Sequence, residues 1–384
     1  MILKNGLVFT EEGQFSPLTI TTDGDRITKL SEDTVQPSDT SEIFDASGCY
    51  IVPGLTDIHF HGCAGHDFCD GTEEAFDAIA AYEFTQGVTT ICPATMTLSA
   101  DILSDILKSA AAYAKSQQKA DAPADRAALV GIHMEGPFIN VNKKGAQNAS
   151  YIQLPTAEAI RRWQKDAEGL VRLISLAPEV EGAVDCIKEC SKEFRFSIAH
   201  TESDYDTAMK AFAAGADHVT HLYNAMPPFT HRAPGVIGAA SDTLNSFVEL
   251  ICDGVHIAPS VVRATFRLFG ADRVILISDS MEATGKPDGT YSLGGLEVHV
   301  NGSHATLSDG TLAGSVTPLY RCVLTAISMG IPLESAIKAA TINPCRSIGI
   351  DHDYGSIRVG KKAHFLILNK NDLSIKAVIK CSKS

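Results

Sequence analysis

The sequence predicts an α/β protein, a (β/α)8 TIM barrel with a small β-sandwich domain built from both chain termini. Short apolar runs alternate with segments of helical period across the middle of the chain, which is the pattern of parallel strands joined by helices. Both ends instead alternate apolar and polar residues over a few positions, as half-exposed strands do. A length of 384 residues suits one barrel and a smaller module.

The two ends of the chain contain short strand-like segments that are broken by Gly and Asp. ILKNGLVF, PLTITTDG and DRITKL lie near the N-terminus, and the tail GSIRVGKKAHFLILNKNDLSIKAVI has the same alternation. We therefore expect residues 1–49 and 350–384 to pair into one small β-sandwich beside a catalytic barrel that spans residues 50–349.

Eight apolar runs are the candidate barrel strands. Segments such as 73–87, 100–116 and 205–215 have helical character and lie between them, and the last ends at Gly215, as helices often do. Strands without polar alternation are typical of parallel sheets covered by helices, and eight in succession indicate a closed barrel. The runs span residues 50–61, 88–95, 128–138, 171–178, 195–201, 217–224, 246–254 and 273–280.

Residues near 290–312 interrupt this pattern. The segment TYSLGGLEVHVNGSHATLSDGTL predicts a β-hairpin excursion with turns at Asn301-Gly302 and Asp309-Gly310. Two helical stretches follow it, at about 315–329 and 333–342.

The charge balance argues against a nucleic acid or an anionic membrane as partner. The chain has 46 acidic and 32 basic residues and a formal charge of −14, so its field repels polyanions. No glycine-rich nucleotide-binding loop is present either. An anionic small molecule would need a local cationic pocket.

The sequence favours a cytoplasmic location. Its first residues, MILKNGLVF, do not resemble a signal peptide, and we find no apolar run long enough to cross a bilayer. The ten cysteines are scattered without a Cys-x-x-Cys pair, which is typical of reduced, mostly buried thiols.

Imidazole and carboxylate side chains stand at the ends of five of the eight runs. Loops after the strands of a (β/α)8 barrel converge on one mouth, where the catalytic residues of such enzymes lie. Imidazole nitrogens with carboxylate oxygens and no thiolate are ligands for Zn²⁺ or Fe²⁺. A single histidine at a strand end is usually structural, but this joint occurrence predicts a metal centre. The residues are His59, His61, Glu135, His200, His221 and Asp279.

Two details refine this prediction. Residues two apart on a strand face the same side, so His59 and His61 can share one ion. Asp279 follows the apolar run VILIS, and a buried carboxylate is costly without a metal or a cation beside it. We expect Asp279 to take a proton from the attacking water and pass it to the leaving group.

A candidate anion pocket follows the sixth and seventh runs. The loop HLYNAMPPFTHRAPG places His231 and Arg232 shortly after His221, and His256 closes the segment DGVH. A planar guanidinium with an imidazole suits a phosphate group, although a structural salt bridge would also explain Arg232.

These motifs together resemble the N-acetylglucosamine-6-phosphate deacetylases of the amidohydrolase superfamily, nearly from end to end of the chain. PGLTDIHFHG is typical of the whole superfamily, whereas HMEGPF with HLYNAMPPFTHRAPG is far more specific. Further matching segments are AHT (199–201), DGVH (253–256), SDSMEATG (278–285) and LAGS (312–315).

The resemblance implies a role for each matching position. Glu135, His200 and His221 correspond to ligands of the catalytic ion, and His59 with His61 to a second ion, so one or two divalent ions are expected. Asp279 corresponds to the acid/base, and a homodimer acting on an amino-sugar phosphate is implied. The implied substrate contacts are Ala146, Gln147, Asn224, Ala225, Arg232 and His256, with Leu312, Ala313 and Gly314 in a loop that closes over the substrate.

The chain departs from the family pattern at two places. Gln147 stands where the family usually has a histidine that approaches the substrate, and glutamine cannot carry charge. Lys362-Ala363-His364 replaces the usual Gly-x-x-Ala-Asp motif of the tail, where we expect only a structural consequence.

Three alternatives stay open at this point. The substrate could be N-acetylgalactosamine 6-phosphate, which differs in one hydroxyl orientation. A cyclic amide hydrolase or aminoacylase would commonly place a carboxylated lysine after the fourth strand, where this chain has Leu176-Ala177-Pro178. A catalytically inactive scaffold would have no need of the complete ligand set and Asp279.

Overall fold

The computed structural model describes residues 1–32, 42–119 and 121–381. Its centre is a curled sheet in which every neighbouring pair of strands is parallel. The predicted α/β class with parallel strands is therefore confirmed. The sheet runs in the order β12 (Ala94–Thr95), β14 (Ile132–Phe138), β15 (Val171–Leu176), β16 (Arg195–Ile198), β17 (His218–Val219), β18 (Phe247–Ile251) and β19 (Val274–Ile277).

A second set of parallel strands continues this sheet on the side of β12. It consists of β8 (Leu55–Asp57), β11 (Val88–Ile91) and β13 (Ala128–Leu129). The segments after β8 and β19 are themselves joined by backbone hydrogen bonds, because Asp279 N donates to His59 O at 2.9 Å and His61 N to Ser280 O at 2.7 Å. The ends of the first and last strands are thus adjacent.

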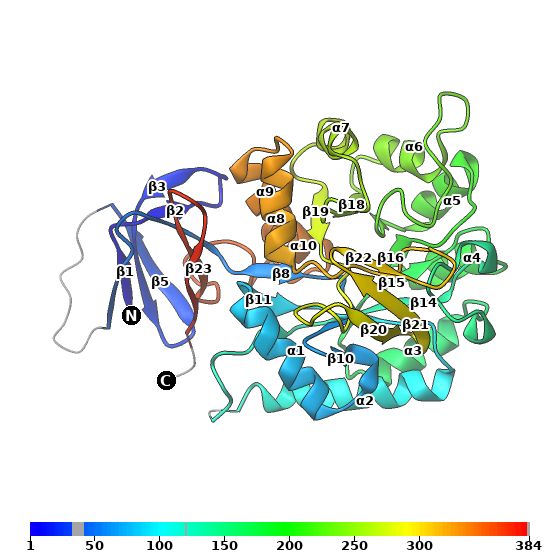
Figure 1. The fold of residues 1–384 in the computed structure, drawn as a ribbon, viewed down its shortest axis with the longest axis horizontal. Helices are drawn as coiled ribbons and strands as arrows, with labels where there is room; N and C mark the ends of the chain where they lie inside the picture. The colour runs from blue at the N-terminus through cyan, green and yellow to red at the C-terminus, as the bar shows by residue number, and fades with distance from the viewer. Residues whose placement is uncertain (33–41, 120, 382–384) are drawn as a thin grey trace.

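Helices cover the outer face of these strands (Figure 1). Several begin at a side-chain cap: Thr72, Ser99, Thr156 and Asp204 each accept a hydrogen bond from the backbone nitrogen three residues later, which satisfies one of the free N–H groups at a helix start. The helices are α1 (Glu73–Thr85), α2 (Ala100–Ser116), α3 (Ala157–Asp166), α4 (Ala183–Cys190), α5 (Tyr205–Ala214), α6 (Gly235–Asp242), α7 (Pro259–Phe269), α8 (Leu319–Ser328), α9 (Leu333–Ala340) and α10 (Ile342–Ser347).

Two small sheets contain both described ends of the chain and lie to one side of the barrel strands (Figure 1). One has the order β5 (Arg26–Ser31), β4 (Thr19–Asp23), β1 (Ile2–Lys4), β6 (Ile43–Asp45). The other has the order β24 (Ile375–Lys380), β23 (His364–Asn369), β7 (Cys49–Pro53), β2 (Leu7–Phe9), β3 (Phe15–Pro17). Leu3 and Ile20 of the first sheet and Val8 and Phe365 of the second belong to one buried apolar cluster.

The strand β7 shows a difference from the sequence analysis. Residues 50–61 were expected to form one barrel strand, but Cys49–Pro53 pairs with β2 and β23 of the terminal sheet, and the barrel strand begins only at Leu55. Both halves of this run are buried, so hydrophobicity alone does not separate them.

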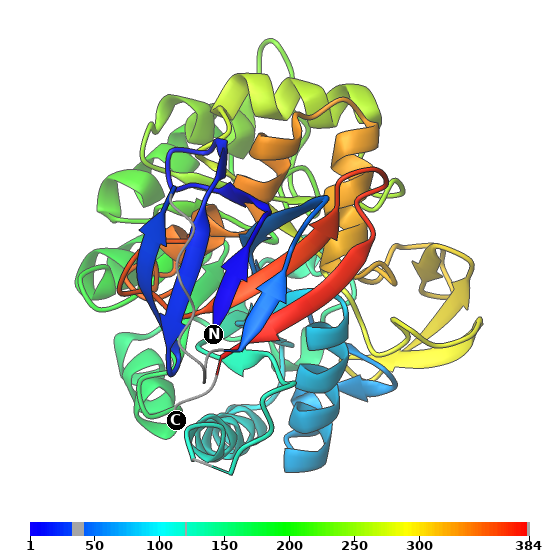
Figure 2. The same ribbon diagram turned by 90° about the vertical axis from the view of Figure 1, so that its left-hand side faces the viewer.

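The expected excursion is a three-stranded antiparallel sheet, β20 (Gly289–Leu293), β21 (Leu296–Asn301) and β22 (His304–Thr306), which projects from the barrel in Figure 2. Its apolar side packs against Met96 and Met281, which fixes the following loop above the barrel mouth. The remaining short elements are β9 (Gly62–Cys63), β10 (His66–Asp67), and the 3-10 helices η1 (Phe68–Asp70), η2 (Val141–Lys143) and η3 (Ala149–Tyr151).

Candidate active site

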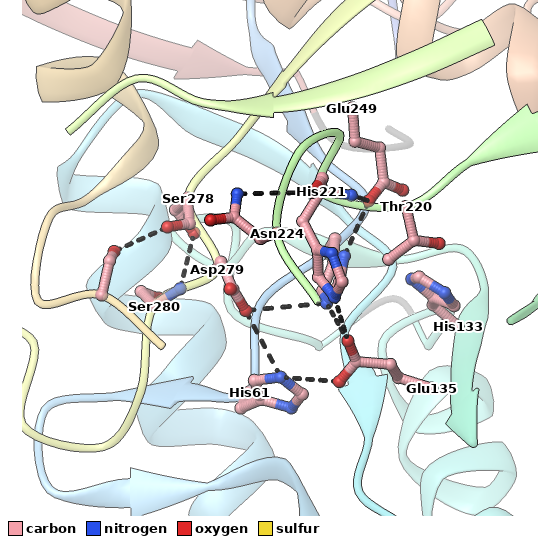
Figure 3. Close-up of polar contacts among 12 residues, drawn as sticks. His61, His133, Glu135, Thr220, His221, Asn224, Glu249, Ser278, Asp279 and Ser280 are labelled. Carbon is pink, nitrogen blue, oxygen red and sulfur yellow. Dashed lines mark hydrogen bonds and ion pairs between the residues drawn. The ribbon is translucent and has the colours of Figure 1, made fainter. Parts of the chain in front are cut away.

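The five predicted metal ligands, His59, His61, Glu135, His200 and His221, meet the predicted acid/base Asp279 near the carboxyl ends of the barrel strands. Figure 3 shows His61, Glu135, His221 and Asp279 of this group. Glu135 lies at the centre of this group. Its Oε1 is 3.1 Å from Nε2 of both His200 and His221, and its Oε2 is 3.2 Å from Nε2 of His61. Asp279 Oδ1 lies 3.4 Å from the same nitrogen of His61. We call this group of six residues the floor of the site.

The floor contains two sets of three groups whose ligand atoms lie within 4.8 Å of one another. One set is Glu135, His200 and His221, and the other is His59, His61 and Asp279. His59 Nε2 is buried without a hydrogen-bond partner in the described part of the chain, although it lies 3.3 Å from Glu135 Oε1. A buried imidazole nitrogen without a hydrogen-bond partner beside two carboxylates fits a divalent cation, which would bind the neutral form of the ring.

Three of these residues have unusual backbone conformations. The φ angles of His200, His221 and Asp279 are 45°, 31° and 50°, which is the left-handed region that residues with a Cβ rarely adopt. Each stands shortly after the end of its strand. Such strain persists where the surrounding structure enforces it, as it commonly does at functional sites.

The two acids of the floor are ionised in the structure. Burial raises the pKa of the Glu135 carboxyl, but the charge of His59 and the hydrogen bonds from His200 and His221 outweigh it and hold this pKa well below its usual range. Burial opposes ionisation of Asp279 as well, and the bond from His61 with the charge of His59 lowers its pKa. Both carboxylates are therefore available as ligands or proton acceptors.

The floor opens into a cavity of about 510 Å³. Its walls include most of the predicted substrate contacts, and they also include Lys143 and Lys144, which the sequence analysis did not select. Ala313 is buried behind the wall. The predicted residues that line the cavity are Ala146, Gln147, Asn224, Ala225, His256, Leu312 and Gly314.

His256 is fixed in the wall by its neighbour Asp253. Its Nδ1 donates to Asp253 Oδ2 at 2.7 Å, and its backbone nitrogen donates to Oδ1 at 2.9 Å. Burial lowers the pKa of the His256 imidazole, but this hydrogen bond and the charges of Asp253 and Asp279 outweigh it, so the pKa is raised. The wall thus offers an imidazole that is held in place and whose charged form is favoured by its neighbours.

Arg232 occupies a different position from the other predicted contacts. It is exposed, as is its neighbour His231, and neither lines the cavity. Figure 1 shows the segment that leads into α6 as a protruding loop, and Phe229 on this loop is 52% exposed. The role of Arg232 as a phosphate contact stays a prediction.

Gln147 contacts the floor directly. Its Nε2 donates to Glu135 Oε2 at 2.7 Å, and its Oε1 accepts from the backbone nitrogen of Thr97 at 2.6 Å. The residue is only 2% exposed in total. Its carbonyl oxygen and one amide hydrogen are therefore used to hold Glu135, which leaves one hydrogen for a substrate.

Sequence reasoning missed one buried acid beneath the floor. Glu249 lies in β18 and accepts from His59 Nδ1 at 2.8 Å, from His218 Nε2 at 3.1 Å and from the backbone nitrogen of His221 at 3.1 Å. A signal was present, because Glu249 interrupts the apolar run SFVELICDG at a position where an unpaired carboxylate would be costly.

Comparison with known proteins places the chain in a family. A family model described as the amidohydrolase family matches residues 50–383. The chain belongs to the amidohydrolase family. It is 34% identical over 381 residues to the N-acetylglucosamine-6-phosphate deacetylase of Bacillus subtilis, covering 96% of this chain and 90% of the relative. It is 30% identical to the N-acetylgalactosamine-6-phosphate deacetylase of Escherichia coli O157:H7, covering 83% of each.

Solved structures agree with the sequence relatives. This amidohydrolase superposes with a TM-score of 0.90 on a variant N-acetyl-D-glucosamine-6-phosphate deacetylase from Mycobacterium smegmatis in complex with N-acetyl-D-glucosamine-6-phosphate, at 30% identity, covering all of this chain and 98% of the other. The deacetylase from Thermotoga maritima gives a TM-score of 0.87 at 28% identity, with 100% and 99% covered. The resemblance inferred from the sequence is confirmed.

Two further observations bear on the alternatives. In the structure β15 ends at Leu176, and Ala177 and Pro178 follow it, so the fourth strand provides no lysine for a cyclic amide hydrolase. Among the described helices of this amidohydrolase, none combines the length and the apolar character that a membrane span requires.

Proposed function

We propose that the chain hydrolyses N-acetyl-D-glucosamine 6-phosphate to D-glucosamine 6-phosphate and acetate. One observation carries the proposal: Glu135, His200, His221 and Asp279 converge at the base of a cavity of about 510 Å³. The deacetylases named above support the substrate class, because they match nearly the whole chain. Deacetylation of N-acetylgalactosamine 6-phosphate is the second candidate, since one relative bears that name.

The floor would hold one or two divalent ions, Zn²⁺ or Fe²⁺. Glu135, His200 and His221 would hold the catalytic ion, and His59 with His61 a second one beside Asp279. When bound, such an ion acidifies a water and polarises the acetyl carbonyl. The oxygen and nitrogen ligands do not distinguish these two metals.

Asp279 is suited to move the proton in this reaction. Its pKa is lowered, it is 7% exposed, and it faces the cavity from the floor next to His61. As the water oxygen bonds to the acetyl carbon, Asp279 takes the proton that the water loses. It then gives that proton to the nitrogen as the C–N bond breaks, so that the amine and acetate leave.

The upper walls would orient the sugar and its phosphate. His256 would provide an imidazole held in place by Asp253, with its charged form favoured, and Asn224 and Ala225 also line the cavity. Leu312 and Gly314 lie in the loop after β22, which would close over the substrate. Arg232 would add a guanidinium to the phosphate site, and Ala146 with Gln147 would border the acetyl group.

We further propose that the chain works as a cytoplasmic homodimer. The ten free thiols are consistent with a reducing compartment, and the homodimer follows from the resemblance to the deacetylases. The terminal sheets would act as a separate β-sandwich domain beside a closed (β/α)8 barrel.

Acetate release tests the function. The purified protein, loaded with Zn²⁺ or Fe²⁺, would be incubated with each of the two epimeric N-acetylhexosamine 6-phosphates and with unphosphorylated N-acetylglucosamine. We expect the highest kcat/KM for N-acetylglucosamine 6-phosphate and loss of activity with a chelator. A higher value for the galactosamine epimer would favour the second candidate, and no chelator-sensitive acetate release from either would overturn both.

A further inference from the structure

The supporting layer directly beneath the floor is centred on Glu249. This carboxylate is fully buried in the middle of β18, and Figure 3 shows it beside His221. Its Oε2 is 2.8 Å from His59 Nδ1 and 3.1 Å from the backbone nitrogen of His221, and its Oε1 is 3.1 Å from His218 Nε2. The segment after β8, the segment of β17 and His221, and β18 itself therefore meet at the Glu249 side chain.

The contact between Glu249 and His59 fixes which nitrogen of His59 faces the floor. An ionised carboxylate only accepts hydrogen bonds, so His59 Nδ1 carries a hydrogen, and in the neutral imidazole that binds a metal the lone pair is on Nε2. That Nε2 is the buried atom without a hydrogen-bond partner that lies 3.3 Å from Glu135 and 3.6 Å from Asp279. The lone pair therefore points to where the second ion would lie.

A separate ion site in this layer is excluded by the contacts of its members. Ligand atoms of His59, His133 and Glu249 lie close enough together to hold an ion. However, His133 places Nδ1 against Ile58 O at 3.3 Å and Nε2 against Ser175 Oγ at 2.7 Å. Both oxygens of Glu249 are also hydrogen bonded. Glu249 consequently supports the floor through His59 and does not form a separate ion site with His59 and His133.

We propose that Glu249 is a positioning residue for His59 and thereby sets the affinity for the ion held by His59, His61 and Asp279. The inference rests on the proposed metal centre and not on the identity of the sugar. The ion held by Glu135, His200 and His221 should depend on Glu249 less. His221 contacts Glu249 only through its backbone nitrogen, while its side-chain Nε2 faces Glu135. The two ions should therefore respond differently to a change at Glu249.

The size of the effect follows from comparable sites. Outer partners that orient a metal-bound histidine typically change metal affinity by ~10–100-fold when they are removed. Without Glu249, His59 is free to carry its hydrogen on Nε2, and in that form the nitrogen is no ligand. Leucine at this position removes both the acceptor and the charge, whereas glutamine keeps one acceptor oxygen in nearly the same volume.

The experiment compares Glu249→Leu and Glu249→Gln with wild type and with Ser175→Ala. Ser175 is a matched control because it is buried in the same barrel interior and bonds to His133 and Thr220 but not to Glu249. Each full-length protein would be stripped and reloaded with Zn²⁺ or Co²⁺. Elemental analysis, competition with a chelator and the visible spectrum of the Co²⁺ form would follow the two ions, with circular dichroism and thermal unfolding to check the fold.

The expected result is two ions per chain in wild type and Ser175→Ala. Glu249→Leu should bind one ion as wild type does and the other ~10–100-fold more weakly. The affinity of Glu249→Gln for that second ion should lie between those of wild type and Glu249→Leu. If Glu249→Leu does not fold, a selective loss in Glu249→Gln supports the proposal and its absence overturns it. A wild-type protein with one ion, unchanged affinity in a folded variant, or equal weakening of both ions overturns it as well. Because no sugar is used, these outcomes are separate from those of the acetate assay.

Discussion

The floor and the upper wall of the cavity are built in different ways. The floor residues end barrel strands, are almost fully buried, and are supported from below by Glu249 and from the side by Gln147. The upper wall is made of loops, and Arg232, the cation expected from the sequence to bind the phosphate, is exposed on a protruding loop and does not line the cavity. The difference teaches that strand geometry and buried supporting residues together position the bond-breaking groups, whereas recognition of the phosphate is expected to depend on loops.

Substitutions in the two regions should have different kinetic effects. A change in the floor should impair phosphorylated and unphosphorylated N-acetylglucosamine alike, because both contain the same amide. A change in the upper wall should impair only the phosphorylated sugar. Substitutions in the floor and in the surrounding loops can test this difference between the two sugars.

Replacement of Asp279 by asparagine should affect catalysis most. Asparagine at this position would keep the shape but could not accept the proton, so kcat should fall by ~10²–10⁴-fold for both sugars. Steady-state acetate release measures this, and elemental analysis checks that the ions are retained. Near wild-type turnover with retained metal would refute the role of Asp279.

Arg232→Ala tests whether the exposed loop before α6 contributes to phosphate binding. The loss of a charge-assisted hydrogen bond to phosphate should raise KM for the phosphorylated sugar by ~10–100-fold, with little change for the unphosphorylated one. Arg162→Ala is the control, because Arg162 is an exposed arginine on α3 that pairs with Asp101 away from the cavity. Equal changes for the two sugars would show that Arg232 is structural.

The sequence predicted the floor well because strand ends can be located from hydrophobicity. Each of the eight apolar runs contains a strand, and the five expected ligands converge with Asp279. Glu249 was missed because it lies inside a run and acts from below. The exposed position of Arg232 could not be foreseen, since a loop has no periodicity that fixes its path. The division of residues 49–57 between two sheets was missed because both parts are equally apolar.

His256→Asn should change the pH dependence of binding. The raised pKa of His256 keeps the imidazole charged to higher pH than usual, and a phosphate monoester is a dianion above about pH 6. KM for the phosphorylated sugar should therefore rise as pH increases through the pKa of His256, when the positive charge is lost. His256→Asn should abolish this rise and leave the unphosphorylated sugar unaffected, as KM measured across the pH range would show. Persistence of the rise in the variant would assign it to another group.

Gln147→Met should have the smallest effect and decides to which region Gln147 belongs. The residue lines the cavity but uses its amide to hold Glu135 and Thr97, so it should behave as part of the floor. Methionine has a similar size without the amide, and the loss of the hydrogen bonds to the Glu135 carboxylate and the Thr97 nitrogen should lower kcat/KM by ~10-fold. The decrease should be equal for the two sugars, because Glu135 serves the amide that both contain. Asn148→Ala, in the same loop, controls for loop disturbance. A decrease confined to the phosphorylated sugar would instead place Gln147 with the loops that recognise phosphate.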